Sequence, residues 1–224
     1  MKRSVWLYLA WLLFAIAIPL LSSGLDAKNV TLLCAVVFLL VQLSLGPVLS
    51  GIARRVQARW FFIGAGVVAA CFLEAFHMIS QPFSSVLLIT RGMSAGKMLS
   101  NLAIDLAFTV PSYIVIFSVI WRLAKRYQLS KFEYFIVISL GQSLGDGGLL
   151  FFLGAPFMLL FLPYAIVKYQ AMNFVPYLVV RHRLEPPDNS WKRYVVPVVA
   201  IFVTYFACGA VMNTLWAWSK LGAQ

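Results

Sequence analysis

Residues Val195–Trp218 read VVPVVAIFVTYFACGAVMNTLWAW, 24 positions without a charged side chain. A helix that crosses the hydrocarbon core of a bilayer needs about 20 mostly apolar residues. The stretch is therefore long enough and apolar enough to span a membrane. Its last tryptophans, Trp216 and Trp218, suit the interface where the lipid headgroups begin. The stretch predicts a transmembrane helix.

The composition of the whole chain agrees with this prediction. Of 224 residues, 62% are hydrophobic and 11% are charged, whereas a soluble domain is about 45–50% apolar and about 25% charged. A soluble protein of this size could not bury so much apolar surface. The net charge of +11 does not indicate a nucleic-acid partner, because the basic residues stand at the ends of apolar stretches. The three cysteines lie inside such stretches, which excludes a disulfide framework.

Further apolar stretches predict an all-α, polytopic fold with about seven transmembrane helices, within a range of six to eight, in a single membrane domain over residues 1–224. The earlier spans are expected at Val5–Leu21, Val30–Ser50, Trp60–Ser80, Leu102–Leu123, from Phe132 to a glycine-rich break at Gly141–Gly148, and at Leu149–Val167. The first is expected to be a retained helix rather than a cleaved signal peptide, since its apolar run exceeds the usual length for such peptides.

Two other apolar stretches are too short to span. Pro82–Ser100 is expected to be a re-entrant or interfacial segment, and Ala171–Val180 an interfacial helix.

The orientation follows from the distribution of lysine and arginine between alternate loops. With these spans, fourteen basic residues, Lys168 among them, fall on one side and four fall on the other. Because basic loops stay in the cytoplasm, the N-terminus is predicted to be cytoplasmic and the C-terminus to lie outside. We expect an integral protein of a bacterial inner membrane whose basic loops meet anionic headgroups at the cytoplasmic face.

Several ionisable residues fall inside the predicted spans, where such residues are costly and tend to mark function. Counted at 1.5 Å per residue from the cytoplasmic side, Glu74 and His77 lie roughly 21 and 26 Å deep, in the outer half. Asp105 lies within about one turn of the outer surface, and Gln142 and Asp146 reach a similar level. The sequence therefore predicts a polar layer near the outer surface, which Arg91 and Lys97 on the connecting segment could reach.

The chemistry of this layer has three interpretations. Glu74 and His77 stand three residues apart on one helical face, a spacing that presents a carboxylate and an imidazole to a metal ion, and Asp105 and Asp146 could complete such a site. The same groups could relay protons or bind a substrate. They could also simply pair helices. The sequence identifies neither a metal nor another cofactor.

The glycine-rich break also has two interpretations. It is either the outer turn between two helices or a broken helix of the kind that transporters use to expose backbone groups. Together, Asp105 and the run Leu144-Gly145-Asp146 resemble the aspartate pair of membrane aspartyl proteases such as presenilins and prepilin peptidases. The chain departs from their Gly-x-Gly-Asp motif at Ser143, and it lacks the Pro-Ala-Leu motif of presenilins.

Three functions are consistent with these features. The first is a small transporter or permease-like protein with an outward-facing polar site, because carboxylates and a histidine at one depth suit proton or cation coupling. The second is an intramembrane enzyme that uses the same carboxylates on a lipid or a peptide. The third is a non-catalytic assembly partner that forms a homo-oligomer or binds another membrane protein.

Overall fold

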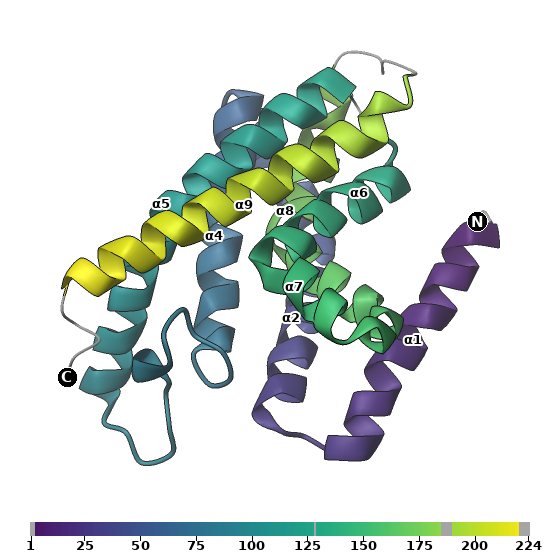
Figure 1. Cartoon of the computed structure of the whole chain (residues 1–224). Helices are drawn as coiled ribbons and strands as arrows, with labels where there is room; N and C mark the ends of the chain where they lie inside the picture. The colour runs from purple at the N-terminus through teal and green to yellow at the C-terminus, as the bar shows by residue number, and fades with distance from the viewer. Residues whose placement is uncertain (1–2, 128, 185–189, 220–224) are drawn as a thin grey trace.

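The computed structural model describes residues 3–127, 129–184 and 190–219, and every regular element in these ranges is helical (Figure 1). Seven helical segments in this part of the chain are long and apolar enough to cross a membrane. These segments are Arg3–Ser23 (α1), Ala27–Ser44 (α2), Ala58–His77 (α4), Ala95–Tyr127 (α5), Lys131–Gly154 (α6 to α7), Pro156–Arg183 (η3 to η4, with α8 between) and Lys192–Ser219 (α9). The structure confirms the predicted seven-helix polytopic fold.

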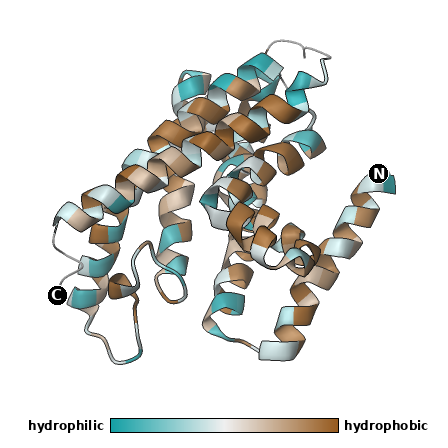
Figure 2. Ribbon diagram, in the orientation of Figure 1, coloured by the Kyte–Doolittle hydropathy of each residue, from teal (hydrophilic) through white to brown (hydrophobic). Residues whose placement is uncertain are grey.

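The helix at the centre of the bundle is α8, Leu162–Val180, which packs against α1, α2, α4 and α6. Half of its span is buried inside the protein, the largest share among the seven. A helix without a distinct polar face is expected to be covered on all sides. By contrast, α1 and α9 are mostly exposed and apolar, which suits contact with lipid. Figure 2 shows this distribution as hydrophobic colouring along the outward surfaces of both helices.

The fifth and sixth spans correct the predicted boundaries. The segment Gly141–Gly148 is not the outer turn between two helices, because α6 (Lys131–Ser143) continues through the π-helical turn η2 (Leu144–Gly148) into the short α7 (Leu149–Gly154). The sixth helix at Leu149–Val167 was therefore a wrong prediction, as was the separate interfacial helix at Ala171–Val180, which belongs to α8. Lys168 follows an apolar run and so resembles a membrane boundary, but it lies in the interior of α8.

The connection between α7 and η3 (Pro156–Phe161) contains no charged residue. In Figure 1 it turns back before reaching the level of the loop between α1 and α2. Backbone groups of such a turn cannot rely on water within a bilayer, so they need protein partners. The indole N–H of Trp11 in α1 supplies one, because it donates to the carbonyl of Leu160 at 2.7 Å. Helix α1 thus supports the turn between the fifth and sixth spans.

Two further segments differ in detail from the prediction. The expected span Val30–Ser50 is divided at Leu45 into α2 and a short helix, α3 (Gly46–Ala53), with Pro47 in its first turn. Pro82–Ser100 forms one 3₁₀ turn, η1 (Ser85–Leu87), before α5 begins at Ala95. This segment folds back on its neighbours, since the Ile89 N–H donates to the Met78 carbonyl at 2.8 Å.

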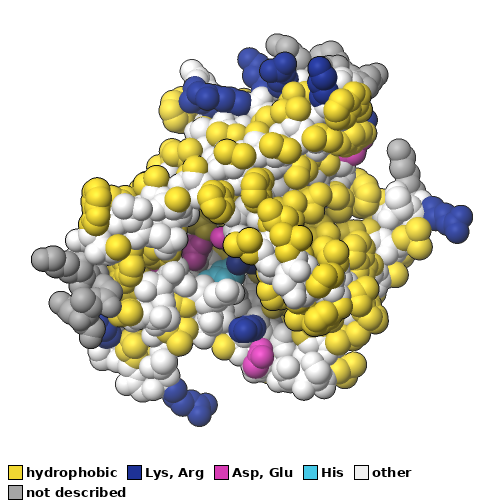
Figure 3. All heavy atoms as spheres, viewed as in Figure 1, with side chains coloured by type: hydrophobic (Ala, Val, Ile, Leu, Met, Phe, Trp, Pro, Cys, Tyr) yellow, Lys and Arg dark blue, Asp and Glu magenta, His cyan; other side chains and the backbone are white. Residues whose placement is uncertain are grey.

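The distribution of basic residues still supports the predicted orientation. Figure 3 shows lysine and arginine side chains gathered at the upper end of the molecule, where α5 ends and α9 begins. With Lys168 moved into the bundle interior, thirteen basic residues remain on the side assigned to the cytoplasm and four on the other. The asymmetry remains large enough for the positive-inside rule to assign the same orientation.

Candidate polar site in the outer half of the bundle

The break η2 determines where Asp146 lies. Gly147 adopts a φ of 87°, a left-handed conformation that glycine adopts without steric cost, and Asp146 leaves helical geometry at φ −85° and ψ 36°. Gly145 is needed for a different reason, because a Cβ there would stand 2.5 Å from the Cβ of Tyr205. The glycines therefore let α9 approach the break closely while the carboxylate of Asp146 leaves the helical path.

Asp146 is paired with two neighbouring residues of α8. The hydroxyl of Tyr169 donates to its Oδ2 at 2.6 Å, and the Nζ of Lys168 lies 3.9 Å from the same oxygen. The Lys168 ammonium also lies 5.4 Å from the centroid of the Tyr169 ring. The lysine that the sequence placed in a cytoplasmic loop is therefore neutralised within the bundle, which explains how a charged residue can occupy this span.

Glu74 provides a second carboxylate from α4. Its Oε1 accepts a hydrogen bond from the hydroxyl of Tyr113 in α5. Glu74 also interacts electrostatically with Asp146, Lys168 and Asp105. Glu74, Asp146 and Lys168 thus come from three different spans and lie within electrostatic range of one another.

His77 stands one turn after Glu74 on α4 and is 6% exposed. Its Nδ1 lies 2.7 Å from the carbonyl oxygen of Leu73, which can only accept, so Nδ1 carries a proton. Its Nε2 makes no hydrogen bond to any residue in the described ranges. His77 also interacts electrostatically with Lys168. One imidazole nitrogen is thus fixed by the backbone of α4, and the other remains available.

A chain of neutral polar side chains adjoins these charged groups. Gln142 donates to the hydroxyl of Tyr205 at 2.8 Å and accepts from the Nδ2 of Asn173 at 3.0 Å. The Oδ1 of Asn173 accepts from the hydroxyl of Tyr134 at 2.9 Å. The chain joins α6, α8 and α9, and the ring of Tyr205 packs edge-on against Tyr169 at 6.2 Å. The neutral network therefore lies directly beside the Asp146 ion pair.

The surface of the protein is hollowed near these elements. Figure 3 shows, on the side of the helix bundle, a hollow in which acidic, basic and histidine side chains are visible among apolar ones. Comparison with Figure 1 shows that α4, α7 and α9 border it in this view. Polar side chains in the middle of an apolar surface are thus accessible from outside the bundle. We call Glu74, His77, Asp146 and Lys168, with their tyrosine partners Tyr113 and Tyr169, the outer polar site.

The remaining predicted site residues make no hydrogen bond or ion pair with the outer polar site in the described part of the chain, although Asp105 lies within electrostatic range of Glu74. Asp105 is fully buried and accepts the backbone N–H of Phe83 at 3.0 Å through Oδ1, while its Oδ2 has no hydrogen-bond partner among the described residues. It anchors the loop after α4 and makes no hydrogen bond to Asp146, so the geometry of an aspartyl-protease pair is not formed. Arg91 and Lys97 are exposed, and neither side chain contacts a carboxylate within residues 3–127, 129–184 and 190–219.

The described part of the chain contains no group of three or more histidine, cysteine, aspartate or glutamate residues placed to hold a metal ion. Glu74 and His77 therefore provide fewer protein ligands than the metal interpretation requires. The arrangement instead favours exchange of protons or binding of charged and polar groups, because each charge has a partner that a ligand could replace.

Sequence reasoning missed Lys168 and the tyrosines and asparagine that surround it. A signal was present, since the window around α8 combines Lys168, Gln170 and Asn173 and has a mean hydropathy of 1.2, the lowest of the seven spans. A prediction that ends a helix at each lysine misses a span that contains one. Tyr113 and Tyr205 left no comparable signal, because tyrosine is common in apolar helices.

Comparison of the chain with models of protein families, with curated proteins and with solved structures found no match.

Proposed function

We propose that this multi-pass membrane protein is a small transporter that binds a polar or charged solute, together with a proton or cation, at the outer polar site. The observation that carries the proposal is that Asp146 and Lys168 form an ion pair between two spans, and that Glu74 of a third span lies within electrostatic range of both, beside a hollow in the protein surface. Ionisable groups within spans are expensive, and in transporters they form the path of substrates and coupling ions.

The helix break supports this proposal. Non-helical backbone at membrane depth is tolerated where protein surrounds it or where it lines water, and transporters place such breaks at their substrate sites. Here the break carries Asp146 itself and lies against α9. A change in the Asp146–Lys168 contact would therefore act directly on the angle between α6 and α7.

The coupling chemistry follows from the groups present. The outer polar site contains two carboxylates and one ammonium, so it carries excess negative charge when both carboxylates are ionised and His77 is neutral. Binding a proton or another cation would offset that excess. Glu74 suits this role because one of its oxygens is held by Tyr113 from a neighbouring helix.

The test is transport by the full chain reconstituted in vesicles with an imposed proton gradient, using a panel of small cationic, zwitterionic and anionic solutes. We expect uptake of at least one solute to depend on the gradient. Glu74→Gln should abolish that dependence while insertion stays normal. Glu133→Gln is the matched control, because it makes the same change from carboxylate to amide far from the outer polar site. Glu133 lies in the first turn of α6 and pairs with Arg193 at 2.9 Å. Equal loss in both variants, or uptake that Glu74→Gln leaves unchanged, would refute the proposal.

An intramembrane enzyme acting on a lipid is the second candidate, and the position of the hollow favours it. Figure 3 shows the hollow on the side of the helix bundle, among apolar side chains of the kind that contact lipid. A headgroup could then reach Asp146 and Glu74 from the outer leaflet. Incubation of the purified protein with labelled lipids in detergent, where no gradient exists, distinguishes the two functions. Product formation that is lost in Asp146→Asn supports the enzyme. If the lipids stay unchanged, enzymatic activity on the lipids tested is excluded.

A further inference from the structure

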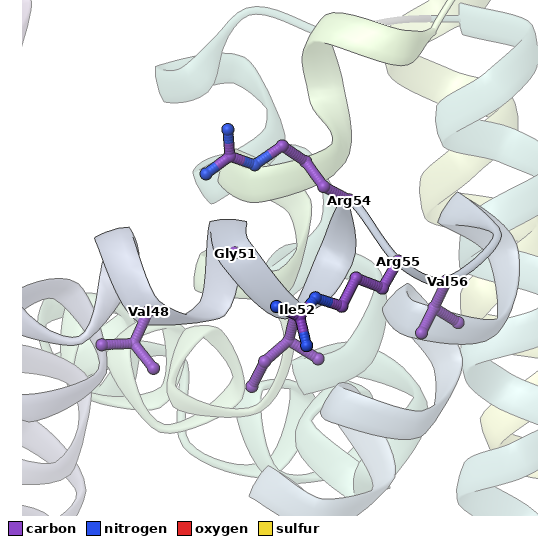
Figure 4. Close-up of a pocket in the computed structure, with 6 residues that line it drawn as sticks. All are labelled: Val48, Gly51, Ile52, Arg54, Arg55 and Val56. Atoms are coloured by element: carbon purple, nitrogen blue, oxygen red, sulfur yellow. The ribbon is translucent and has the colours of Figure 1, made fainter.

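A second polar feature lies at the opposite end of the molecule, in the turn that follows α3. Here an open pocket of about 600 Å³ is lined by Val48, Gly51, Ile52, Arg54, Arg55 and Val56 (Figure 4). The positive-inside rule places this turn at the cytoplasmic surface. The pocket is separate from the outer polar site and takes no part in the proposed transport chemistry.

The two arginines of this pocket are arranged around a glycine. Figure 4 shows both side chains running back along α3 from the turn, one on either side of Gly51. A Cβ at Gly51 would meet no atom within 4 Å, so the space beside this glycine is open. Neither guanidinium forms a hydrogen bond or an ion pair with another residue that the structure describes. Two guanidiniums without a partner among the described residues therefore line one open pocket.

The rest of the pocket is apolar. Val48, Ile52 and Val56 line it, and these side chains are 60%, 50% and 41% exposed. Exposed apolar side chains beside cationic ones are unfavourable in water but suit the boundary between headgroups and acyl chains. The occupant should therefore carry a negative charge at one end and hydrocarbon at the other.

We propose that this pocket binds an anionic phospholipid of the cytoplasmic leaflet, with its phosphate between Arg54 and Arg55 and its acyl chains along Val48 and Ile52. Guanidinium groups match the geometry of phosphate oxygens and bind them through paired hydrogen bonds. The lipid would hold the turn that Arg183, at the end of the sixth span, contacts by donating to the Val56 carbonyl at 3.3 Å. Because α3 also packs against α8, the lipid would stabilise the cytoplasmic end of the central helix.

The experiment measures binding of phosphatidylglycerol to the purified full chain in neutral detergent by mass spectrometry of intact protein–lipid complexes. Arg54→Gln/Arg55→Gln should weaken binding roughly 30-fold, since each basic residue near an anionic surface contributes about a fivefold factor. Arg122→Gln/Lys125→Gln is the matched control, because it removes two exposed charges at the same face. This control should change binding less than about threefold, as expected for charges that act only through the general surface field.

Further arms of the experiment distinguish the lipid from other anions and from simple charge attraction. Phosphatidylcholine should bind much more weakly, and inorganic phosphate at matched concentration should not displace phosphatidylglycerol. Arg54→Lys/Arg55→Lys keeps the charge and should restore only part of the affinity. Equal weakening in the control variant, displacement by phosphate, or full recovery with lysines would each overturn the proposal. Circular dichroism and gel filtration of each variant verify that the helices remain intact.

Discussion

The charges inside the bundle and those at the cytoplasmic end are held in different ways. Inside, Glu74 is bonded to Tyr113, and Asp146 is bonded to Tyr169 and paired with Lys168. At the cytoplasmic end, Arg122 and Lys125 are exposed and form no ion pair within the described part of the chain. A charge surrounded by protein and lipid needs a protein partner, whereas a charge at the surface is solvated by water and headgroups. Substitutions should therefore have large effects inside the bundle and small effects at its end.

The largest effect on stability is expected from Gln142→Leu. Gln142 is fully buried and joins Tyr205 to Asn173, so leucine leaves a hydroxyl and an amide without these partners. Each unsatisfied buried group costs about 1–3 kcal/mol. Because the Asn173 amide keeps its 3.3 Å hydrogen bond to the Tyr169 carbonyl, we expect a loss of about 2–4 kcal/mol in the free energy of unfolding. Denaturant unfolding in mixed micelles measures this loss.

Gln42→Leu is the matched control for that substitution. Gln42 is also buried within a span, but its amide donates to the carbonyl of Ala171, and the loss leaves a single backbone oxygen without this bond. We expect it to cost about 1 kcal/mol. If both variants lose the same stability, the hydrogen-bonded chain of Gln142, Asn173 and Tyr205 contributes no more to the free energy of unfolding than a single side chain-to-backbone bond.

Lys168→Met should have the next largest effect, about 1–2 kcal/mol, because it leaves Asp146 with only the hydrogen bond from Tyr169. The effect is moderated by solvent, since the side chains of Lys168 and Asp146 are 25% and 50% exposed. The double variant Lys168→Met/Asp146→Leu should recover part of the loss, because no unpaired carboxylate remains. A double-mutant cycle measures the coupling, and additive losses would show that the two charges act independently.

These interior contacts also show how far the sequence could predict the molecule. The number of spans and their orientation follow from apolar length and from the basic loops, which are local properties of the chain. The depth of Glu74 and Asp146 follows by counting along helices. The partner of Asp146 cannot be predicted in this way, because a lysine after an apolar run, such as Lys168, is typical of a helix end. The same holds for Asp105, whose partner Phe83 lies in an irregular loop that no periodic pattern describes.

A smaller effect is expected from Ser130→Ala at the start of α6. The Ser130 hydroxyl accepts from the Glu133 N–H at 3.3 Å, and the Glu133 carboxylate accepts from the Ser130 N–H at 2.8 Å, which together form a capping box. Loss of such a cap typically costs about 0.5–1 kcal/mol at an exposed position. Unfolding in mixed micelles tests this value, and Ser130→Asp, which retains an N-cap acceptor, should restore most of it. A loss as large as that of Gln142→Leu would contradict the distinction between interior and surface.

The smallest effect is expected from Arg122→Gln/Lys125→Gln, which removes two exposed charges where α5 meets the cytoplasmic surface. Surface substitutions without specific partners change stability by less than about 0.5 kcal/mol, and glutamine keeps the polarity that the headgroup region solvates. The same charges do contribute to topology, but eleven of the thirteen basic residues on this side remain, so the orientation should persist. Accessibility of single cysteines introduced in the loops before α4 and after α5 measures orientation, and unfolding measures stability. A destabilisation that approaches that of Lys168→Met would mean that the exposed charges are held by specific partners, and the difference between the two regions would then be one of degree.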